Sequence, residues 1–135
     1  MATVAALYVI AAVLFVLLDA IWLGYAAKGI YAAELGPLLL ASPNLLVAAG
    51  FYALYLAGLL VFVIHPAARA DSVLHALIYG AFFGLIAYGT YDLTNLATLR
   101  GFTPRIAMID MAWGCVLTAS VCSGAVILAR ILKVI

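Results

Sequence analysis

The chain has 135 residues, of which 70% are hydrophobic and 8% are charged, and its mean hydropathy is +1.33. A chain of this composition has too little polar surface to cover a water-soluble globule, so composition predicts an integral membrane protein surrounded by a lipid bilayer. The net charge of +1 and the lack of any Lys/Arg block exclude a nucleic-acid-binding surface.

The first apolar run covers about residues 3–28 and is long enough to span a bilayer, which takes about 20 residues. It ends at Lys28-Gly29, a cation followed by a glycine, as is typical of a helix C-terminus. The connection over 29–42 mixes Gly36 and Pro37 with leucines, which indicates a re-entrant or interfacial segment rather than a free loop.

The second predicted span covers 43–64. Ser42-Pro43 precedes it as N-cap and first helical residue, and His65-Pro66 follows it as a stop.

The third and fourth predicted spans cover 72–100 and 104–133. Asp71 or Ser72 is the candidate N-cap of the third span, and Thr103-Pro104 is the candidate start of the fourth. Gly80 and Gly84 form a GxxxG pair that favours close helix packing. The four spans together predict an all-α fold, an integral membrane four-helix bundle with short loops, as a single domain over 1–135.

Alternating helix direction brings four span ends to one side of the membrane, which we call the loop-one face: Lys28, Pro43, Arg100 and Pro104. Asp19, Asp92 and Asp110 lie nine, eight and six residues from these ends, hence roughly 9 to 14 Å below the loop-one face. Each acid costs about 2.5 to 3.5 kcal/mol to insert. We therefore expect the three to converge on one cavity, with a proton, a cation or an arginine among them.

Helical spacing groups polar and aromatic residues with these acids. Trp22 and Trp113 each follow an acid by three residues, and an indole N–H can donate to a carboxylate on a neighbouring helix. Such residues are also common as interfacial anchors and interhelical contacts. The predicted substrate- or ion-binding residues are Asp19, Trp22, Tyr88, Tyr91, Asp92, Asn95, Asp110 and Trp113, with supporting residues Tyr52, Asn44, Arg100 and Arg105.

Three segments carry a family resemblance: Leu18-Asp-Ala-Ile-Trp-Leu-Gly24, Tyr88-Gly-Thr-Tyr-Asp-Leu-Thr-Asn95 and Asp110-Met-Ala-Trp-Gly114. With them the chain resembles the small bacterial inner-membrane proteins catalogued as domain of unknown function 2177. The resemblance implies a four-span, multi-pass protein of the bacterial inner membrane and draws attention to the same aspartates and tryptophans. It implies no particular activity.

Three functions remain open from the residues. The acid layer suits a small transporter or channel for a proton, cation or small amphipathic solute. It also suits an intramembrane lipid-modifying enzyme with one protonated and one ionised aspartate. A structural or assembly subunit, whose acids pair with arginines or a partner, is the third alternative. The residues predict no cofactor, and an oxygen-liganded divalent ion is left open.

Self-association and orientation complete the expectations. Small residues repeat on the second span at Ala49, Ala53 and Ala57, and such faces favour helix contacts in membranes, so we expect a homo-oligomer, with a dimer favoured. Cationic residues divide evenly between the two membrane faces, and only the N-terminal amine favours cytoplasmic termini.

Overall fold

The computed structural model describes residues 1–135 and is helical, with no strand. Four helices are long and apolar enough to cross a membrane: Ala2–Ala26, Leu45–Arg69, Val73–Thr98 and Pro104–Ile131. The all-α architecture with four candidate spans is therefore confirmed.

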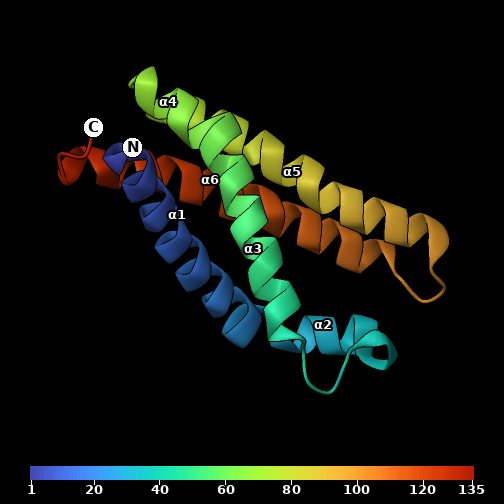
Figure 1. Ribbon diagram of the computed structural model, residues 1–135. Helices are drawn as coiled ribbons and strands as arrows, with labels where there is room; N and C mark the ends of the chain where they lie inside the picture. Colours follow the sequence, from blue (N-terminus) through green and yellow to red (C-terminus); the bar gives the residue numbers. More distant parts are fainter.

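The first span consists of α1 (Ala2–Ile21) and a π-helical turn (Trp22–Ala26). It ends at Ala27, and Lys28, predicted to lie at the end of this span, instead begins the short helix α2 (Lys28–Leu35). A 3₁₀ turn, Gly36–Leu38, follows. The connection is thus folded, and α2 leaves the direction of α1 to lie beside the start of the fourth span (Figure 1).

The second span is longer than predicted. It comprises α3 (Leu45–Leu59), a π-helical turn (Leu60–Ile64) and α4 (His65–Arg69). The expected stop at His65-Pro66 was wrong, because Pro66 lies in the first turn of α4 directly after the wider turn, where its missing N–H removes no regular α-helical bond. The expected N-cap was also wrong, since the Asn44 side chain accepts the hydrogen bond from the Val47 N–H, at 3.2 Å.

The third and fourth spans, α5 (Val73–Thr98) and α6 (Pro104–Ile131), begin at the predicted caps. Ser72 accepts from the His75 N–H at 3.1 Å, and Thr103 accepts from the Ile106 N–H at 3.3 Å. The turn between them contains Gly101 at φ +81°, a left-handed conformation that glycine adopts without strain.

Helices α5 and α6 run side by side and form the closest helix pair (Figure 1). The Gly80 and Gly84 pair lies at their contact: a Cβ on Gly80 would lie 3.0 Å from the Thr118 carbonyl oxygen, and one on Gly84 2.8 Å from the Thr118 Cβ. Both glycines therefore permit an approach that any larger residue would prevent.

The main apolar core fills the half of the bundle that carries both chain ends (Figure 1). All four spans contribute to it, and most of its side chains are completely inaccessible. Its members include Leu7, Ala11 and Phe15 of α1, Leu59, Val63 and Ile64 of the second span, Ala76 of α5, and Leu117, Val121, Cys122, Val126 and Ala129 of α6. Cys122 is thus a packing residue of this core, and both Cys115 and Cys122 are free thiols.

Candidate functional site

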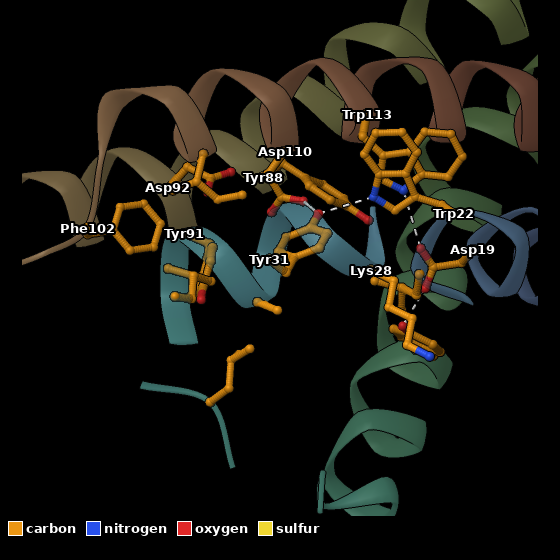
Figure 2. Close-up of a pocket in the computed structure, with 16 residues that line it drawn as sticks. Asp19, Trp22, Lys28, Tyr31, Tyr88, Tyr91, Asp92, Phe102, Asp110 and Trp113 are labelled. Carbon is orange, nitrogen blue, oxygen red and sulfur yellow. Dashed lines mark hydrogen bonds between the residues drawn. The ribbon is translucent and has the colours of Figure 1, made fainter. Parts of the chain in front are cut away.

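A cavity of about 460 Å³ lies toward the loop-one face, on the other side of Phe15 from the main core. Figure 2 shows the side chains around it, which come from α1 and its π-helical turn, α2, α3, α5 and α6. Asp19, Asp92 and Asp110 all line this cavity. Three acids from three separate spans are thus neighbours in space.

Asp19 belongs to α1 and is fixed by donors from two other spans. The Tyr52 hydroxyl of α3 donates to Asp19 Oδ2 at 2.5 Å, and the Trp113 indole Nε1–H of α6 donates to Asp19 Oδ1 at 3.3 Å. Asp19 is 6% exposed. Its two oxygens therefore tie three spans together at the inner end of the cavity.

The two tryptophans of the chain stack on each other inside the cavity wall. The ring centroids of Trp22 and Trp113 are 4.4 Å apart and their planes differ by 6°. Trp22 Nε1–H donates to the Tyr31 hydroxyl at 3.1 Å, and that hydroxyl donates to Asp110 Oδ1 in a short hydrogen bond. Two hydrogen-bonded groups, Trp113 with Asp19 and Trp22 with Tyr31 and Asp110, are thus joined by the stacked indoles (Figure 2).

Tyr31 lies in α2, outside the four spans, and closes one side of the cavity. Burial raises the pKa of its hydroxyl above the ordinary value, and the hydrogen bond to Asp110 raises it further. Tyr31 therefore remains a proton donor to the carboxylate at any physiological pH.

Asp92 is in a different situation from the other two acids. Its side chain is 0% exposed, and no phenol, indole or main-chain N–H donates a hydrogen bond to either carboxyl oxygen. It lies beside Asp110 in the wall of the cavity (Figure 2), and the two carboxyls are close enough to share a proton. Two adjacent carboxyls in an apolar setting do not both ionise, so this pair differs chemically from Asp19.

Tyr88 and Tyr91 complete the wall that α5 contributes. The Tyr88 ring lies against the backbone of Gly114, where any Cβ would come within 2.7 Å of the ring atom Cδ1. Tyr91 makes an edge contact with Phe102 in the turn before α6, with ring centroids 6.0 Å apart. Glycine at 114 thus sets the depth at which the Tyr88 phenol enters the site.

Four sequence-predicted residues do not line the cavity: Asn95, Asn44, Arg100 and Arg105. Asn95 follows Asp92 by three residues and is half-buried outside the cavity, because that spacing rotates a side chain by about 60° around the helix. Asn44 is occupied as the cap of α3. Of the proton, cation or arginine expected among the acids, the cavity lining contains a cation, Lys28, and no arginine.

Arg105 instead forms an ion pair with Glu34 of α2, with Nη1 and Oε1 3.3 Å apart. The Thr103 hydroxyl donates to the same carboxylate, and Leu35 packs with Phe102 and Ile106 in a small apolar cluster. These contacts hold α2 against the start of α6 and thereby place Tyr31 over Asp110. Arg100 is exposed in the turn between α5 and α6.

Sequence reasoning missed Tyr31 and Lys28. Tyr31 is the link between Trp22 and Asp110, and Lys28 is exposed at the edge of the cavity, where it is the one cationic side chain in the lining. The sequence signal that could have indicated them was a phenol and a cation at or next to the connection over 29–42, which was expected to be interfacial.

The donor set gives the site its chemical character. Three carboxyls face a single lysine, and most of the remaining lining is aromatic or aliphatic. No group of three histidine, cysteine or acidic side chains is arranged to share a metal ion. An acidic, aromatic-lined cavity of this kind attracts protons, ammonium groups and hydrogen-bond donors and repels anions.

The fold is that of a multi-pass membrane protein with four candidate spans. The chain belongs to the family described as a predicted membrane protein, domain of unknown function 2177, whose model matches residues 4–127. Searches of curated proteins and of solved structures found no match to the chain.

Proposed function

We propose that this protein is a small transporter that binds a proton or a cationic, small amphipathic solute in the cavity, with Asp92 as the binding carboxyl. The observation that carries the proposal is Asp92 itself, a fully buried carboxyl that receives no hydrogen bond from a phenol, an indole or the main chain and whose polar neighbour is the carboxyl of Asp110. Buried charge without a partner is strongly unfavourable, and ionisable groups inside membrane bundles commonly mark ion or proton pathways.

The other two acids have different roles in this proposal. Asp19 and Asp110 accept hydrogen bonds from tyrosine and tryptophan side chains. In this proposal they fix the helices around the cavity and keep its electrostatic potential negative. Asp92 is left to exchange its proton or to pair with the ammonium group of a solute.

Alternating access suits this arrangement better than a channel. The cavity lies at the loop-one end, and the other half of the bundle is filled by fully buried apolar side chains. A solute bound at Asp92 therefore crosses only if the helices move and expose it toward the termini.

Reconstituted vesicles test the proposal. We expect proton-coupled uptake of a small amine such as butylamine by the wild type, loss of at least tenfold on Asp92→Asn, and retention of folding by size exclusion and thermal melting. The control is Asp71→Asn, which alters an exposed acid paired with Arg130 far from the cavity. Uptake that is equal in the wild type and Asp92→Asn would refute the proposal.

An intramembrane lipid-modifying enzyme is the second candidate, supported by the neighbouring carboxyls of Asp92 and Asp110 and the phenol of Tyr31 at one of them. Two adjacent carboxyls can hold different protonation states and serve as acid and base. A lipid product that accumulates in cells with the wild type but not with Asp110→Asn would favour this candidate, and no change in lipids would count against it.

A further inference from the structure

A second hollow, of about 630 Å³, opens between α3 and α5 on the side of the bundle. We call it the lateral groove and define it by its lining: Phe51 and Tyr55 of α3, Ala87, Tyr88, Thr90, Tyr91 and Thr94 of α5, and Asp110 of α6. Tyr88, Tyr91 and Asp110 also line the acidic cavity. These three side chains are therefore the wall that the two hollows share.

The lateral groove exists because α3 diverges from α5. The second and third spans approach each other at the π-helical turn Leu60–Ile64 and at α4, near the termini. Closer to the loop-one face, the Tyr55 ring of α3 contacts the Phe83 ring of α5, with centroids 5.8 Å apart. Tyr55 also lines the groove.

The groove faces the bilayer. Phe51 is 56% exposed and Tyr91 is 54% exposed, and both belong to membrane-spanning helices. The hydroxyls of Thr90 and Thr94 turn back to the carbonyls of Ile86 and Thr90, so they present methyl groups rather than free donors. The lining is therefore compatible with hydrocarbon along most of its length, while its inner end reaches a carboxyl.

From this shared lining we infer that the solute is an amine carrying a hydrocarbon chain, which enters sideways from the bilayer, with its chain in the lateral groove and its ammonium group at Asp110, the carboxyl that lines both hollows, beside Asp92. The inference rests on the proposed function, because it uses the same carboxyls. It adds the substrate class and the route of entry.

Charge and shape support this occupant. Three carboxyls against one lysine repel phosphate and carboxylate headgroups and attract an ammonium group. Both hollows fall within the range of about 300 to 1,000 Å³ that is typical of small-molecule sites. A hydrocarbon tail in the groove stays in an apolar environment, while the ammonium headgroup leaves the membrane interface for the carboxyl. The interaction of the headgroup therefore decides selectivity.

The tryptophans of the protein provide a probe of binding. Its only two tryptophans, Trp22 and Trp113, form the stacked pair in the cavity wall, so tryptophan emission, excited selectively over that of the tyrosines, reports on this site alone. In lipid nanodiscs we expect dodecylamine to change the tryptophan emission in a saturable manner. Dodecanoate, of equal chain length and opposite charge, should not do so at the same concentration in the membrane.

Substitutions at three matched threonines test the groove independently of the cavity. Thr90, Thr94 and Thr98 each bond to the carbonyl four residues back and are exposed, but only the first two line the groove. We expect Thr90→Phe and Thr94→Phe to weaken dodecylamine binding at least tenfold and to leave butylamine unchanged, whereas Thr98→Phe should leave both unchanged. If either phenylalanine variant folds poorly, Thr94→Leu replaces it.

The possible results are distinct. Unchanged dodecylamine binding in the groove variants would overturn lateral entry while leaving the site at Asp92 intact. Saturable binding of dodecanoate as tight as that of dodecylamine would overturn the assignment of an amine. No saturable response to either amine, together with no effect of Asp92→Asn on uptake, would overturn the proposed function as well.

Discussion

The three aspartates of the cavity differ in their hydrogen bonding, and this difference predicts different contributions to stability. Asp19 receives bonds from Tyr52 and Trp113, whereas Asp92 receives none. A residue with two donors stabilises the fold, and a buried carboxyl without donors destabilises it.

We therefore expect opposite effects of the same substitution at these two positions. Asp19→Asn should lower the free energy of unfolding by about 1 to 3 kcal/mol, because an amide cannot accept both bonds. Asp92→Asn should leave thermal stability unchanged or raise it. Thermal unfolding of both variants in the same detergent, followed by circular dichroism, measures the difference, and equal losses would contradict it.

Tyr31 gives a prediction on alkaline pH. Its folded pKa is raised above the ordinary value of 10.0 by burial and by its bond to Asp110. Above pH 10 the unfolded chain loses the phenolic proton and the folded chain keeps it, so the contribution of Tyr31 to stability is full below pH 10 and falls as the pH rises beyond it.

Replacement of Tyr31 by phenylalanine removes this contribution. We expect the stability of the wild type to fall more steeply than that of Tyr31→Phe between pH 10 and pH 11, as measured by thermal unfolding. Tyr25→Phe, at an exposed tyrosine outside the cavity, is the control and should follow the wild type. Parallel curves for all three proteins would show that Tyr31 is not buried in this way.

At the scale of the helices, the contact between α5 and α6 rests on glycine. A Cβ at Gly84 would collide with Thr118, whereas Gly50 on α3 has nothing within 4 Å of the same added atom. Overpacking of a tight contact costs typically 1 to 3 kcal/mol. We expect Gly84→Ala to lower stability by about this amount and Gly50→Ala to have no such cost, with melting temperatures in detergent as the measurement.

Helix caps and hydropathy made most of this arrangement predictable from the sequence. Ser72, Thr103 and Gly101 mark the ends of α5 and α6 by local chemistry, so the depth of Asp92 and Asp110 could be counted from them. The second span was predicted too short, because a proline normally ends a helix and the compensating π-helical turn leaves no clear signature in the sequence.

The lining of the cavity was predictable only in part, because local sequence patterns do not specify every contact that forms it. Shared depth grouped the three aspartates, but depth does not specify rotation about a helix axis, and so Asn95 was included although it lies outside the cavity. Tyr31 was missed because its position depends on how α2 folds back on α6 through Glu34 and Thr103, which are about 70 residues apart in the sequence. Such long-range contacts are not encoded in local periodicity.

At the scale of the whole molecule, the outer face of α3 suggests how copies associate. Ala49, Gly50 and Ala53 are exposed on it and form a small-residue face toward the bilayer. Such faces allow close approach of helices in membranes. We propose a dimer formed through this face.

Crosslinking in lipid tests the dimer. We expect Gly50→Leu to abolish a crosslinked dimer that the wild type forms, because the added side chain separates the helices. Ser120→Leu, an equivalent enlargement at an exposed position on α6, should leave the dimer intact. A monomeric wild type in both mild detergent and nanodiscs would contradict the proposal.

The apolar core near the termini has an electrical consequence. The acidic cavity lies at the loop-one end and the apolar core fills the other half of the bundle, so in the proposed transporter the membrane potential falls mainly across the packed half, between Asp92 and the chain ends. A cation that travels from Asp92 to that side crosses most of the field, which changes its energy by about 2.3 kcal/mol per 100 mV. If each cycle moves one net charge, the uptake rate should therefore change with an imposed potassium diffusion potential. If one ammonium ion is exchanged for one proton at Asp92, no net charge moves and the uptake rate should be the same at every voltage.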